Sequence, residues 1–270
     1  SVREMLELGD GCTVLGILGN PLGKSKSPAM QNAALRASGI RGVYLPFETP
    51  DLERAADVIR GYGIRGVNVT IPFKQDIIDH LDRVDSVAER IGAVNTVVND
   101  DGVLTGYNTD VVGIGCALDR AGIDVTDGRA VVMGSGGAAR ACLEYLASRN
   151  CEVTVAARNE ETGRRLASEF GQKYRSPSSV SVRMHDLLVN CTPVGMYSDG
   201  PYPIGLDGID RGLAVFDMVY GSETPLVRAA REKECRVAYG ADMLAGQGAE
   251  SFRLWTGIGD AFGIMRRELE

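Results

Sequence analysis

The sequence predicts an α/β fold with two domains: an N-terminal α/β substrate domain and a Rossmann-type domain built on a parallel sheet. Short β-branched runs alternate with helical patterns along the whole chain. In the second half, residues 130–133, 153–157, 187–190 and 213–216 are almost wholly apolar. Strands of a parallel sheet look like this, because helices cover both of its faces. A glycine-rich segment at 134–139 follows the first of these runs and precedes a helical pattern.

The first half of the chain predicts strands at 14–18, 43–47 and 66–71. Helices are expected from Ser27, over 51–60 and after Pro72. Ser27 stands where an N-cap would be, with Pro28 at the first helical position. Residues 94–99 and 103–105 predict a hairpin around the Asp-Asp-Gly turn at 100–102.

The character of the sequence changes near Asp110, where a long helix is expected to begin and to run to about residue 121. Further helices are expected over 140–148, behind the run at 153–157, and from 243 onward. The C-terminal helices could close either domain. We assign residues 1–109 plus 241–270 to the substrate domain and 110–240 to the dinucleotide domain. The stretch 174–184 is crowded with Ser and Pro and has no clear period.

Composition excludes several classes of function. The net charge of −7 argues against a nucleic-acid surface, which needs concentrated Lys and Arg. The six cysteines form no Cys-x-x-Cys pair and neither of the two histidines lies near one in sequence, so no metal site is expected. No apolar run reaches the ~20 residues of a membrane helix, and the first residues lack a signal-peptide core. We expect a cytoplasmic protein with reduced cysteines that binds neither nucleic acid nor membrane.

The glycine-rich segment matches the dinucleotide fingerprint in its strand–loop–helix context. The first glycine permits a tight turn, the second lets the backbone approach a pyrophosphate, and a small third residue lets helix and strand pack closely. A helix N-terminus then offers N–H groups to phosphate. The alternative is a glycine-rich loop without a ligand. The expected cofactor-binding residues are Gly134, Ser135, Gly136, Gly137, Ala138 and Ala139.

The end of the next predicted strand favours NADP over NAD. NAD enzymes often carry Asp or Glu there, whereas this chain has Arg158. A guanidinium binds a 2′-phosphate bidentately, and Arg164 and Arg165 lie nearby. Against this, Glu160 and Glu161 could repel the phosphate or bind a ribose. Arg158 could also be an ordinary surface arginine.

Two short polar motifs are candidates for the chemistry. Asn68 and Thr70 lie two apart in an otherwise apolar predicted strand, so they share one face, and Lys74 follows just past Pro72. Residues 108–110 read Asn-Thr-Asp where the long helix begins. Taken alone, Lys74 could be a solvated lysine, and the threonine or Asp110 could be a helix cap.

Together the motifs resemble those of the shikimate dehydrogenase family. They are Gly-x-Asn-Val-Thr-x-Pro-x-Lys at 66–74, Asn-Thr-Asp at 108–110, Gly-Ser-Gly-Gly-Ala-Ala-Arg at 134–140 and Trp-Thr-Gly at 255–257. The resemblance covers nearly the whole chain in the same order. It implies reversible NADPH-dependent reduction of 3-dehydroshikimate to shikimate in aromatic amino-acid (chorismate) biosynthesis. The small-molecule partners would be those two ring acids, and the protein would be a monomer or a homodimer.

The resemblance also implies roles for individual residues. Lys74 and Asp110 would form the catalytic pair, because a lysine can stabilise and protonate the alkoxide that hydride transfer creates. Ser25 and Ser27 would bind the substrate carboxylate. The remaining roles are contacts to the ring hydroxyls or carboxylate by Asn68, Thr70, Asn95 and Gln247, a place in the substrate pocket for Tyr220, and proximity to the nicotinamide for Thr192, Gly240 and Met243.

The sequence departs from the family pattern in ways that bear on substrate and cofactor. The family often has His where this chain has Lys24 and Gln31, Gly where it has Val111, Thr where it has Asn159, and a basic residue where it has Thr162. A quinate/shikimate or aminoshikimate dehydrogenase of the same superfamily therefore stays open. A non-catalytic NADP-binding protein is the more distant alternative, and an altered Lys–Asp pair, which is intact here, would be its signature.

Overall fold

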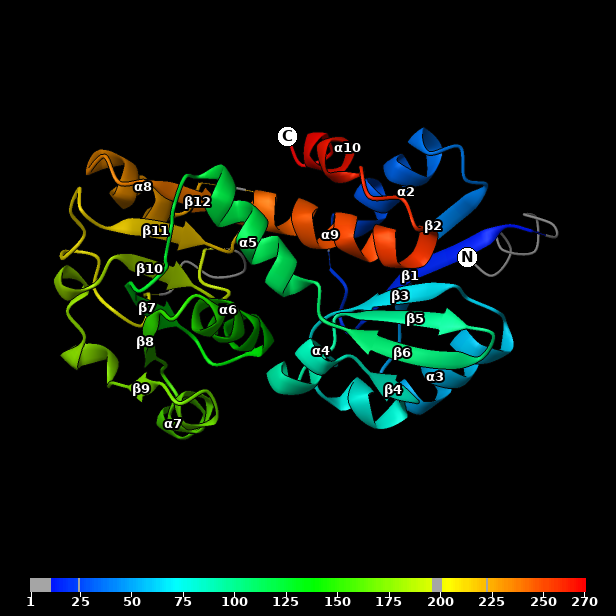
Figure 1. Cartoon of the computed structure of the whole chain (residues 1–270), viewed down its shortest axis with the longest axis horizontal. Coiled ribbons are helices and arrows are strands. Elements are labelled where there is room, and N and C mark those ends of the chain that lie inside the picture. The colour runs from blue at the N-terminus through cyan, green and yellow to red at the C-terminus, as the bar shows by residue number, and fades with distance from the viewer. Residues whose placement is uncertain (1–10, 24, 196–200, 222) are drawn as a thin grey trace. The chain divides into compact units, whose positions relative to one another are not determined.

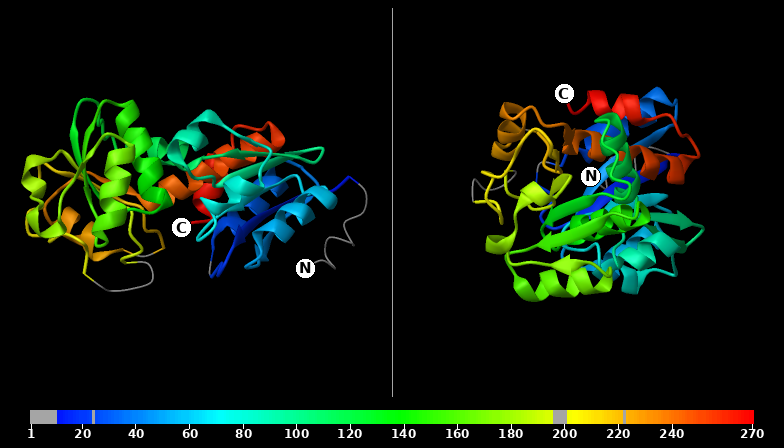
Figure 2. Two further views of the ribbon diagram at one scale, coloured as in Figure 1. Left: turned by 90° about the horizontal axis from the view of Figure 1, so that it is seen from below. Right: turned by 60° about the vertical axis from the view of Figure 1, so that its left-hand side comes forward.

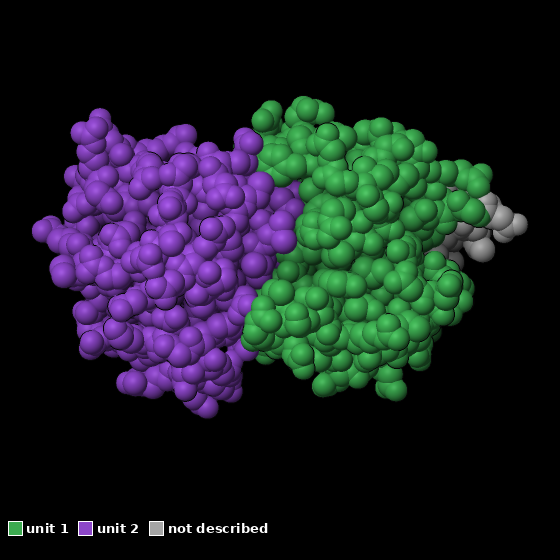
Figure 3. Space-filling model, viewed as in Figure 1, with its two compact units in different colours: residues 1–109, 247–270 green, residues 110–246 purple. Residues whose placement is uncertain are grey.

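The computed structural model describes residues 11–23, 25–195, 201–221 and 223–270 of the chain. The chain divides into two compact units, residues 1–109 with 247–270 and residues 110–246 (Figures 1 and 3). The second division falls within helix α9 (Gly240–Thr256), so residues 241–246 group with the second unit. The expected α/β class, with a Rossmann-type parallel sheet in the second half, is confirmed.

The first unit is built on a mixed six-stranded sheet with the order β2-β1-β3-β5-β6-β4. Strand β1 lies between β2 and β3 and pairs in parallel with both, because helices α2 and α3 carry the chain back between these strands. The later strands β5 and β6 pair antiparallel. The strands are β1 (Thr13–Gly19), β2 (Gly42–Glu48), β3 (Gly66–Val69), β4 (Arg83–Val84), β5 (Thr96–Asp100) and β6 (Val103–Tyr107), and the helices are α2 (Ser27–Ala37), α3 (Leu52–Gly61), α4 (Ser86–Ile91) and α10 (Phe262–Arg267).

The expected hairpin is confirmed between β5 and β6. Its two turn residues, Asp101 and Gly102, have φ of 51° and 90°. Positive φ at both central positions belongs to a type I′ turn, whose twist matches that of the flanking strands.

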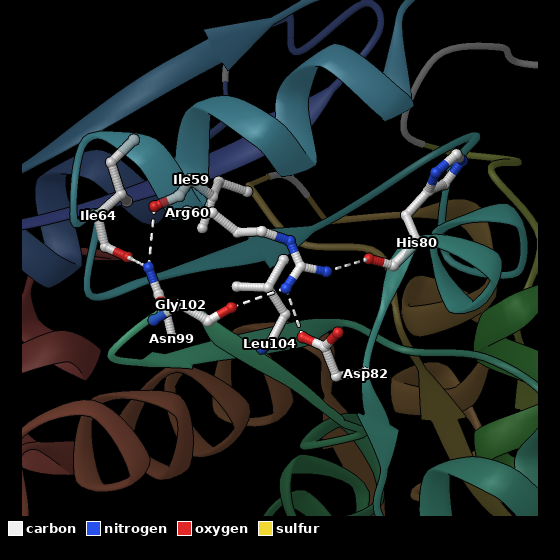
Figure 4. A network of polar contacts seen from close by, with 8 residues as sticks. All are labelled: Ile59, Arg60, Ile64, His80, Asp82, Asn99, Gly102 and Leu104. Atoms are coloured by element: carbon white, nitrogen blue, oxygen red, sulfur yellow. Dashed lines mark hydrogen bonds and ion pairs between the residues drawn. The ribbon is translucent and has the colours of Figure 1, made fainter.

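A polar network fastens this hairpin to the end of α3 (Figure 4). The buried Asn99 amide donates to the carbonyls of Ile59 and Ile64 at 2.8 and 3.0 Å. The Arg60 guanidinium contacts the Asp82 carboxylate and the carbonyls of His80 and Gly102. The Ile59 carbonyl lies in the last turn of α3, where helical partners run out, and it accepts from the Ile64 amide as well as from Asn99. These bonds give this network a structural role.

The second unit is a parallel six-stranded sheet with the order β12-β11-β10-β7-β8-β9. Numbered from β7, this is the strand order 3-2-1-4-5-6 of a dinucleotide-binding fold. The order reverses between β7 and β10, and ligands of such sheets bind at the carboxyl ends of the strands there. The strands are β7 (Arg129–Met133), β8 (Glu152–Ala156), β9 (Lys173–Tyr174), β10 (Leu187–Asn190), β11 (Ala214–Asp217) and β12 (Val237–Tyr239).

Helices flank this sheet (Figures 1 and 2). They are α5 (Asp110–Arg120), α6 (Gly137–Ser148), α7 (Glu160–Glu169) and α8 (Pro225–Glu232). The expected start of α5 at Asp110 is confirmed. The Ser-rich stretch 174–184 holds two short 3₁₀ helices, η2 (Pro177–Ser179) and η3 (Val182–Met184). The sequence had not predicted α4, α8, β4, β9 or β12.

Two local predictions were wrong. Residues 71–75 after β3 form turns that lead into a 3₁₀ helix, η1 (Asp76–His80), where a helix of the ordinary kind was expected. The β-branched pair at 77–78 and its flanking aspartates disfavour an α-helix. Ser27 is not the N-cap of α2. It is the first helical residue, and its N–H donates to Ser25 Oγ at 3.3 Å, so Ser25 supplies the oxygen that Ser27 was expected to supply.

Membrane-spanning helices and clusters of metal ligands can be assessed for the described part of the chain. No helix among the described residues is long and apolar enough to cross a membrane. The same residues contain no group of three or more His, Cys, Asp or Glu placed to hold a metal ion. All six cysteines lie in described segments and are free thiols.

Candidate functional site

The glycine-rich loop joins β7 to α6 in the second unit. Gly134 has φ +115°, and a Cβ there would lie 3.2 Å from the Cys191 carbonyl oxygen, so both conformation and space call for glycine. Gly136 is the N-cap of α6 and has extended backbone. No side chain caps this helix, and a Cβ at Gly136 would meet nothing within 4 Å. The first amides of α6 therefore face open space, as a phosphate site requires.

The loop after β10 lies against this segment at the reversal of strand order. A Cβ at Gly134 would also lie 3.3 Å from Thr192 Cγ2. Buried Asn190 fixes Thr192, because its Oδ1 accepts from the Thr192 hydroxyl at 2.6 Å and from its N–H at 3.0 Å. The Asn190 amide nitrogen donates to Asp217 Oδ1 at 2.9 Å. The ends of β7, β10 and β11 are thus joined by close contacts.

Asp217 is the buried hub of these contacts. Burial raises the pKa of its carboxyl, while hydrogen bonds from Thr224, the Val219 amide and Asn190 oppose the rise. Thr224 also caps α8. Neither Asn190 nor Asp217 is among the residues that the sequence predicts for a site. The sequence does carry a signal for them, because each is a polar residue at the last position of an otherwise apolar strand.

Arg158 follows β8 and is exposed. Among the described residues it makes no hydrogen bond or ion pair. Arg164 differs, because it pairs with Glu160 at 2.6 Å and lies over the Tyr174 ring at 4.8 Å. The Glu160 carboxylate is thereby partly neutralised. An exposed guanidinium in this position can receive an anion.

A hydroxyl pair links the glycine-rich loop to α7. Ser135 Oγ lies 2.9 Å from Thr162 Oγ1. The Thr162 amide in turn donates to the side chain of Asn159, the N-cap of α7, at 3.0 Å. Thr162 therefore connects the glycine-rich loop with the segment that carries Arg158.

In the first unit, buried polar side chains gather where β3, β5 and α9 meet. Asn68, Thr96 and Ser251 are at most 5% exposed. Thr96 Oγ1 lies 2.8 Å from Ser251 Oγ, and the Asn68 amide nitrogen donates to both hydroxyls at 3.1 and 3.0 Å. We call Asn68, Asn95, Thr96, Thr109 and Ser251 the polar cluster. Sequence reasoning had missed Thr96 and Ser251.

Asn95 and Thr109 complete this cluster. Asn95 Oδ1 accepts from the Thr109 N–H at 2.8 Å, and its amide nitrogen lies 3.0 Å from Thr109 Oγ1 and 3.4 Å from Gln247 Oε1. The polar cluster thus contains Asn68 and Asn95 and contacts Gln247, and all three are residues that the sequence predicts for the substrate site. The Thr109 hydroxyl is used here and in a 3.0 Å contact with Ser251.

The remaining sequence-predicted residues have the following places. Ser27 is buried at the start of α2, and half-buried Ser25 accepts a hydrogen bond from its N–H. Half-buried Thr70 and Lys74 follow β3, with the Lys74 carbonyl accepting from the Val94 amide at 2.7 Å. In the second unit, Asp110 is 4% exposed at the start of α5. Tyr220 is half-buried after β11, Met243 is buried, and a Cβ at Gly240 would lie 2.3 Å from the Met218 carbonyl oxygen.

Two family models match the chain. The one described as "Shikimate dehydrogenase substrate binding domain" matches residues 17–97. The one described as "Shikimate 5'-dehydrogenase C-terminal domain" matches residues 240–270. The first range contains Ser25, Ser27 and the Asn68–Lys74 segment, and the second contains Gln247 and Ser251.

Relatives of known name are similar over nearly their whole length. A protein of Archaeoglobus fulgidus named "Shikimate dehydrogenase (NADP(+))" is 41% identical, with 93% of this chain and 96% of the relative covered. A protein of the same name from Methanothermobacter thermautotrophicus is 38% identical, with 95% of each chain covered.

Solved structures are similar in both fold and sequence. A shikimate 5-dehydrogenase from Thermus thermophilus, solved with NADP(H) and shikimate, superposes with a TM-score of 0.89 at 38% identity, covering 95% of this chain and 98% of that chain. A quinate dehydrogenase from Corynebacterium glutamicum, solved with NAD, gives a TM-score of 0.87 at 30% identity, covering 95% and 98%.

Proposed function

The chain belongs to the shikimate dehydrogenase family, and we therefore propose that it catalyses the reversible NADPH-dependent reduction of 3-dehydroshikimate to shikimate, a step of chorismate biosynthesis. The observation that carries this proposal is the similarity to NADP-dependent shikimate dehydrogenases over nearly the whole of both chains. A parallel sheet of dinucleotide-binding order and a cluster of buried polar groups in a separate unit support it.

Each unit would bind one of the two reactants. Residues from 110 to the start of α9 would bind NADP(H), and residues 1–109 with the end of the chain would bind the ring acid. The sequence placed the second boundary at 240/241, whereas the compact units divide at 246/247, so α9 would contribute to both functions.

The groups of the second unit fit NADP. The uncapped N-terminus of α6 and the open space at Gly136 suit a pyrophosphate, because amides there lack protein acceptors. Arg158 would bind the 2′-phosphate. Thr192, Gly240 and Met243 would lie near the nicotinamide. When bound, NADPH supplies the hydride, so this chain has to supply binding, orientation and a proton.

The first unit would hold the ring acid. Ser25 and Ser27 would donate hydrogen bonds to its carboxylate. Asn68, Thr70, Asn95 and Gln247 would contact its hydroxyls or its carboxylate, and Tyr220 would line the pocket. The interlocked hydrogen bonds of the polar cluster support this role, since a ring with several hydroxyls is best recognised by polar groups whose orientation is fixed.

Lys74 would handle the proton. Its ammonium would stabilise the negative charge that develops on the carbonyl oxygen during reduction and would give that oxygen a proton. In the reverse direction the neutral amine would take the proton from the substrate hydroxyl. Asp110 would keep the ammonium in place as its carboxylate partner. This mechanism requires no metal ion.

A related ring acid is the second candidate substrate. The quinate dehydrogenase from Corynebacterium glutamicum shares the fold at 30% identity. Quinate is therefore the alternative substrate and NAD the alternative cofactor. Initial rates at 340 nm with shikimate or quinate, each with NADP or NAD, separate the candidates. We expect the shikimate–NADP pair to give the highest kcat/KM. No turnover of shikimate above background would refute the proposed function, and a higher kcat/KM for quinate would reassign the substrate.

We also propose that the protein works in the cytoplasm as a monomer or homodimer. Six free thiols support a reducing compartment. Light scattering on the purified protein would give the oligomeric state, and a mass above that of a dimer would contradict it.

A further inference from the structure

The Asn68 amide has no hydrogen left to offer a ligand. Its nitrogen carries two hydrogens and lies within hydrogen-bonding distance of three acceptors, the Asn95 carbonyl at 3.2 Å and the hydroxyls of Thr96 and Ser251 at 3.1 and 3.0 Å. All of these residues are buried. Asn68 can therefore contribute only through its oxygen.

The orientation of the Asn68 side-chain amide is fixed, because it faces a group that can only accept a hydrogen bond. The Asn95 carbonyl can only accept, so the Asn68 nitrogen must face it. Asn68 Oδ1 is then turned to the other side, where it accepts a hydrogen bond from the Tyr44 hydroxyl at 2.8 Å. A carbonyl oxygen has two lone pairs, so one acceptor position on Oδ1 is left.

Tyr44 is itself held firmly. It is 1% exposed, and its ring packs against Trp255 with centroids 6.2 Å apart. Its backbone is clamped by the Asn32 side chain of α2, which accepts from the Tyr44 N–H and donates to its carbonyl, both at 2.9 Å. Burial raises the pKa of the phenol well above its ordinary value of 10.0, and a hydrogen bond with Ser27 opposes the rise. The phenol therefore keeps its proton and stays a donor.

We propose that Tyr44 is a positioning residue of the substrate site, whose hydroxyl holds the Asn68 side chain so that the remaining Oδ1 acceptor meets a hydroxyl of the ring acid. This inference rests on the proposed function. It assigns Asn68 to a hydroxyl and not to the carboxylate, since two oxygens without a hydrogen between them repel. It also links α2, which carries Ser27, to Asn68 through one side chain.

The substitution Tyr44→Phe tests this role, because it removes the hydroxyl and leaves the ring against Trp255. We expect the KM for shikimate to rise about three- to tenfold, the effect of one lost hydrogen bond. The kcat should change less than twofold, and the Kd for NADPH should stay unchanged. Tyr145→Phe removes the hydroxyl of a buried tyrosine of α6 and is the matched control. It should leave the KM for shikimate and the kcat unchanged. An unchanged KM in Tyr44→Phe would overturn the proposal.

A double-mutant cycle with Asn68→Ala separates positioning from general loosening. If Tyr44 acts through Asn68, Tyr44→Phe will have no further effect on kcat/KM once the amide is gone. If the double variant instead loses kcat/KM by the product of the two single losses, the proposal is overturned. Melting temperatures equal to that of the wild type would show that this loss does not come from unfolding. The experiments distinguish a failure of the proposed function from a failure of the role assigned to Tyr44. A wild type that does not turn over shikimate contradicts the proposed function, whereas wild-type turnover with an unaffected Tyr44→Phe variant contradicts the role of Tyr44.

Discussion

Replacing Gly136 by alanine should separate cofactor binding from folding. Gly136 has φ −88° and ψ −171°, which any residue can adopt. An added methyl would meet no protein atom within 4 Å. The methyl would instead occupy the open space before the amides of α6, where we place the pyrophosphate. The protein should fold normally and bind NADPH poorly.

The magnitudes follow from these two environments. Alanine at an N-cap lowers the stability of the folded protein by up to about 1 kcal/mol relative to glycine. Alanine also reduces the entropy of the unfolded chain, which raises the stability by about 0.4–1 kcal/mol. The free energy of unfolding should therefore change by less than about 1 kcal/mol. Displacing a phosphate from one charge-assisted hydrogen bond costs about 1.5–3 kcal/mol. At about 1.36 kcal/mol per factor of ten, the Kd for NADPH should rise about 10- to 100-fold.

Fluorescence titration with NADPH and urea unfolding measure the two quantities on the same preparation. Gly134→Ala is the contrasting variant, because φ +115° and a 3.2 Å contact should cost it about 1–3 kcal/mol of stability. Gly263→Ala, in α10 with open space around it, is the neutral control for NADPH binding. A Gly136→Ala variant with wild-type affinity for NADPH would refute the placement of the pyrophosphate.

Three further outcomes are expected. Arg158→Ala should raise the Kd for NADP about 10- to 100-fold and the Kd for NAD less than twofold, since only NADP has the 2′-phosphate; an equal loss for both would discard this role. Thr162→Val removes the hydroxyl pair with the glycine-rich loop and should weaken both cofactors about threefold, as titration would show; an unchanged Kd would leave the pair without a role. Burial raises the pKa of Tyr44, Tyr145 and Tyr202 above 10.0 in the folded protein. Their contribution to stability is therefore complete below pH 10 and is lost as pH rises beyond it, so urea midpoints that stay flat from pH 9 to 11 would contradict the burial of these phenols.

The glycine-rich loop was predictable because its signals are contiguous. A turn at Gly134, space at Gly136 and a following helix all lie within a few residues, and strand context removes most alternatives. The same holds for the hairpin at Asp101–Gly102, where local backbone preference decides the turn.

The polar cluster was only half predictable, because its members are distant in sequence. Thr96 and Ser251 are 155 positions apart, and neither carries a motif that marks it as buried. The same is true of Asn190 and Asp217, which meet only once β10 and β11 pair. Such contacts depend on tertiary packing, which single-sequence patterns do not contain.

The two wrong local predictions have separate physical causes. Ser27 starts α2 as its first helical residue, because its amide binds the Ser25 hydroxyl instead of its own hydroxyl capping the helix. After Pro72, the β-branched pair at 77–78 and its flanking aspartates disfavour an α-helix, so the chain forms the 3₁₀ helix η1 (Asp76–His80). Both segments carry residues that we assign to substrate binding or catalysis, where local preference often yields to the site.

The proton role of Lys74 is the claim on which the mechanism depends, and Lys74→Ala tests it most directly. The measurement is kcat for shikimate oxidation at saturating NADP, together with the Kd for NADPH by titration. The account predicts that kcat falls about 10²- to 10⁴-fold, the usual contribution of a positioned acid or base, while the Kd stays within twofold of wild type. A variant that binds NADPH normally and keeps kcat within threefold of wild type would show that the proton comes from another group.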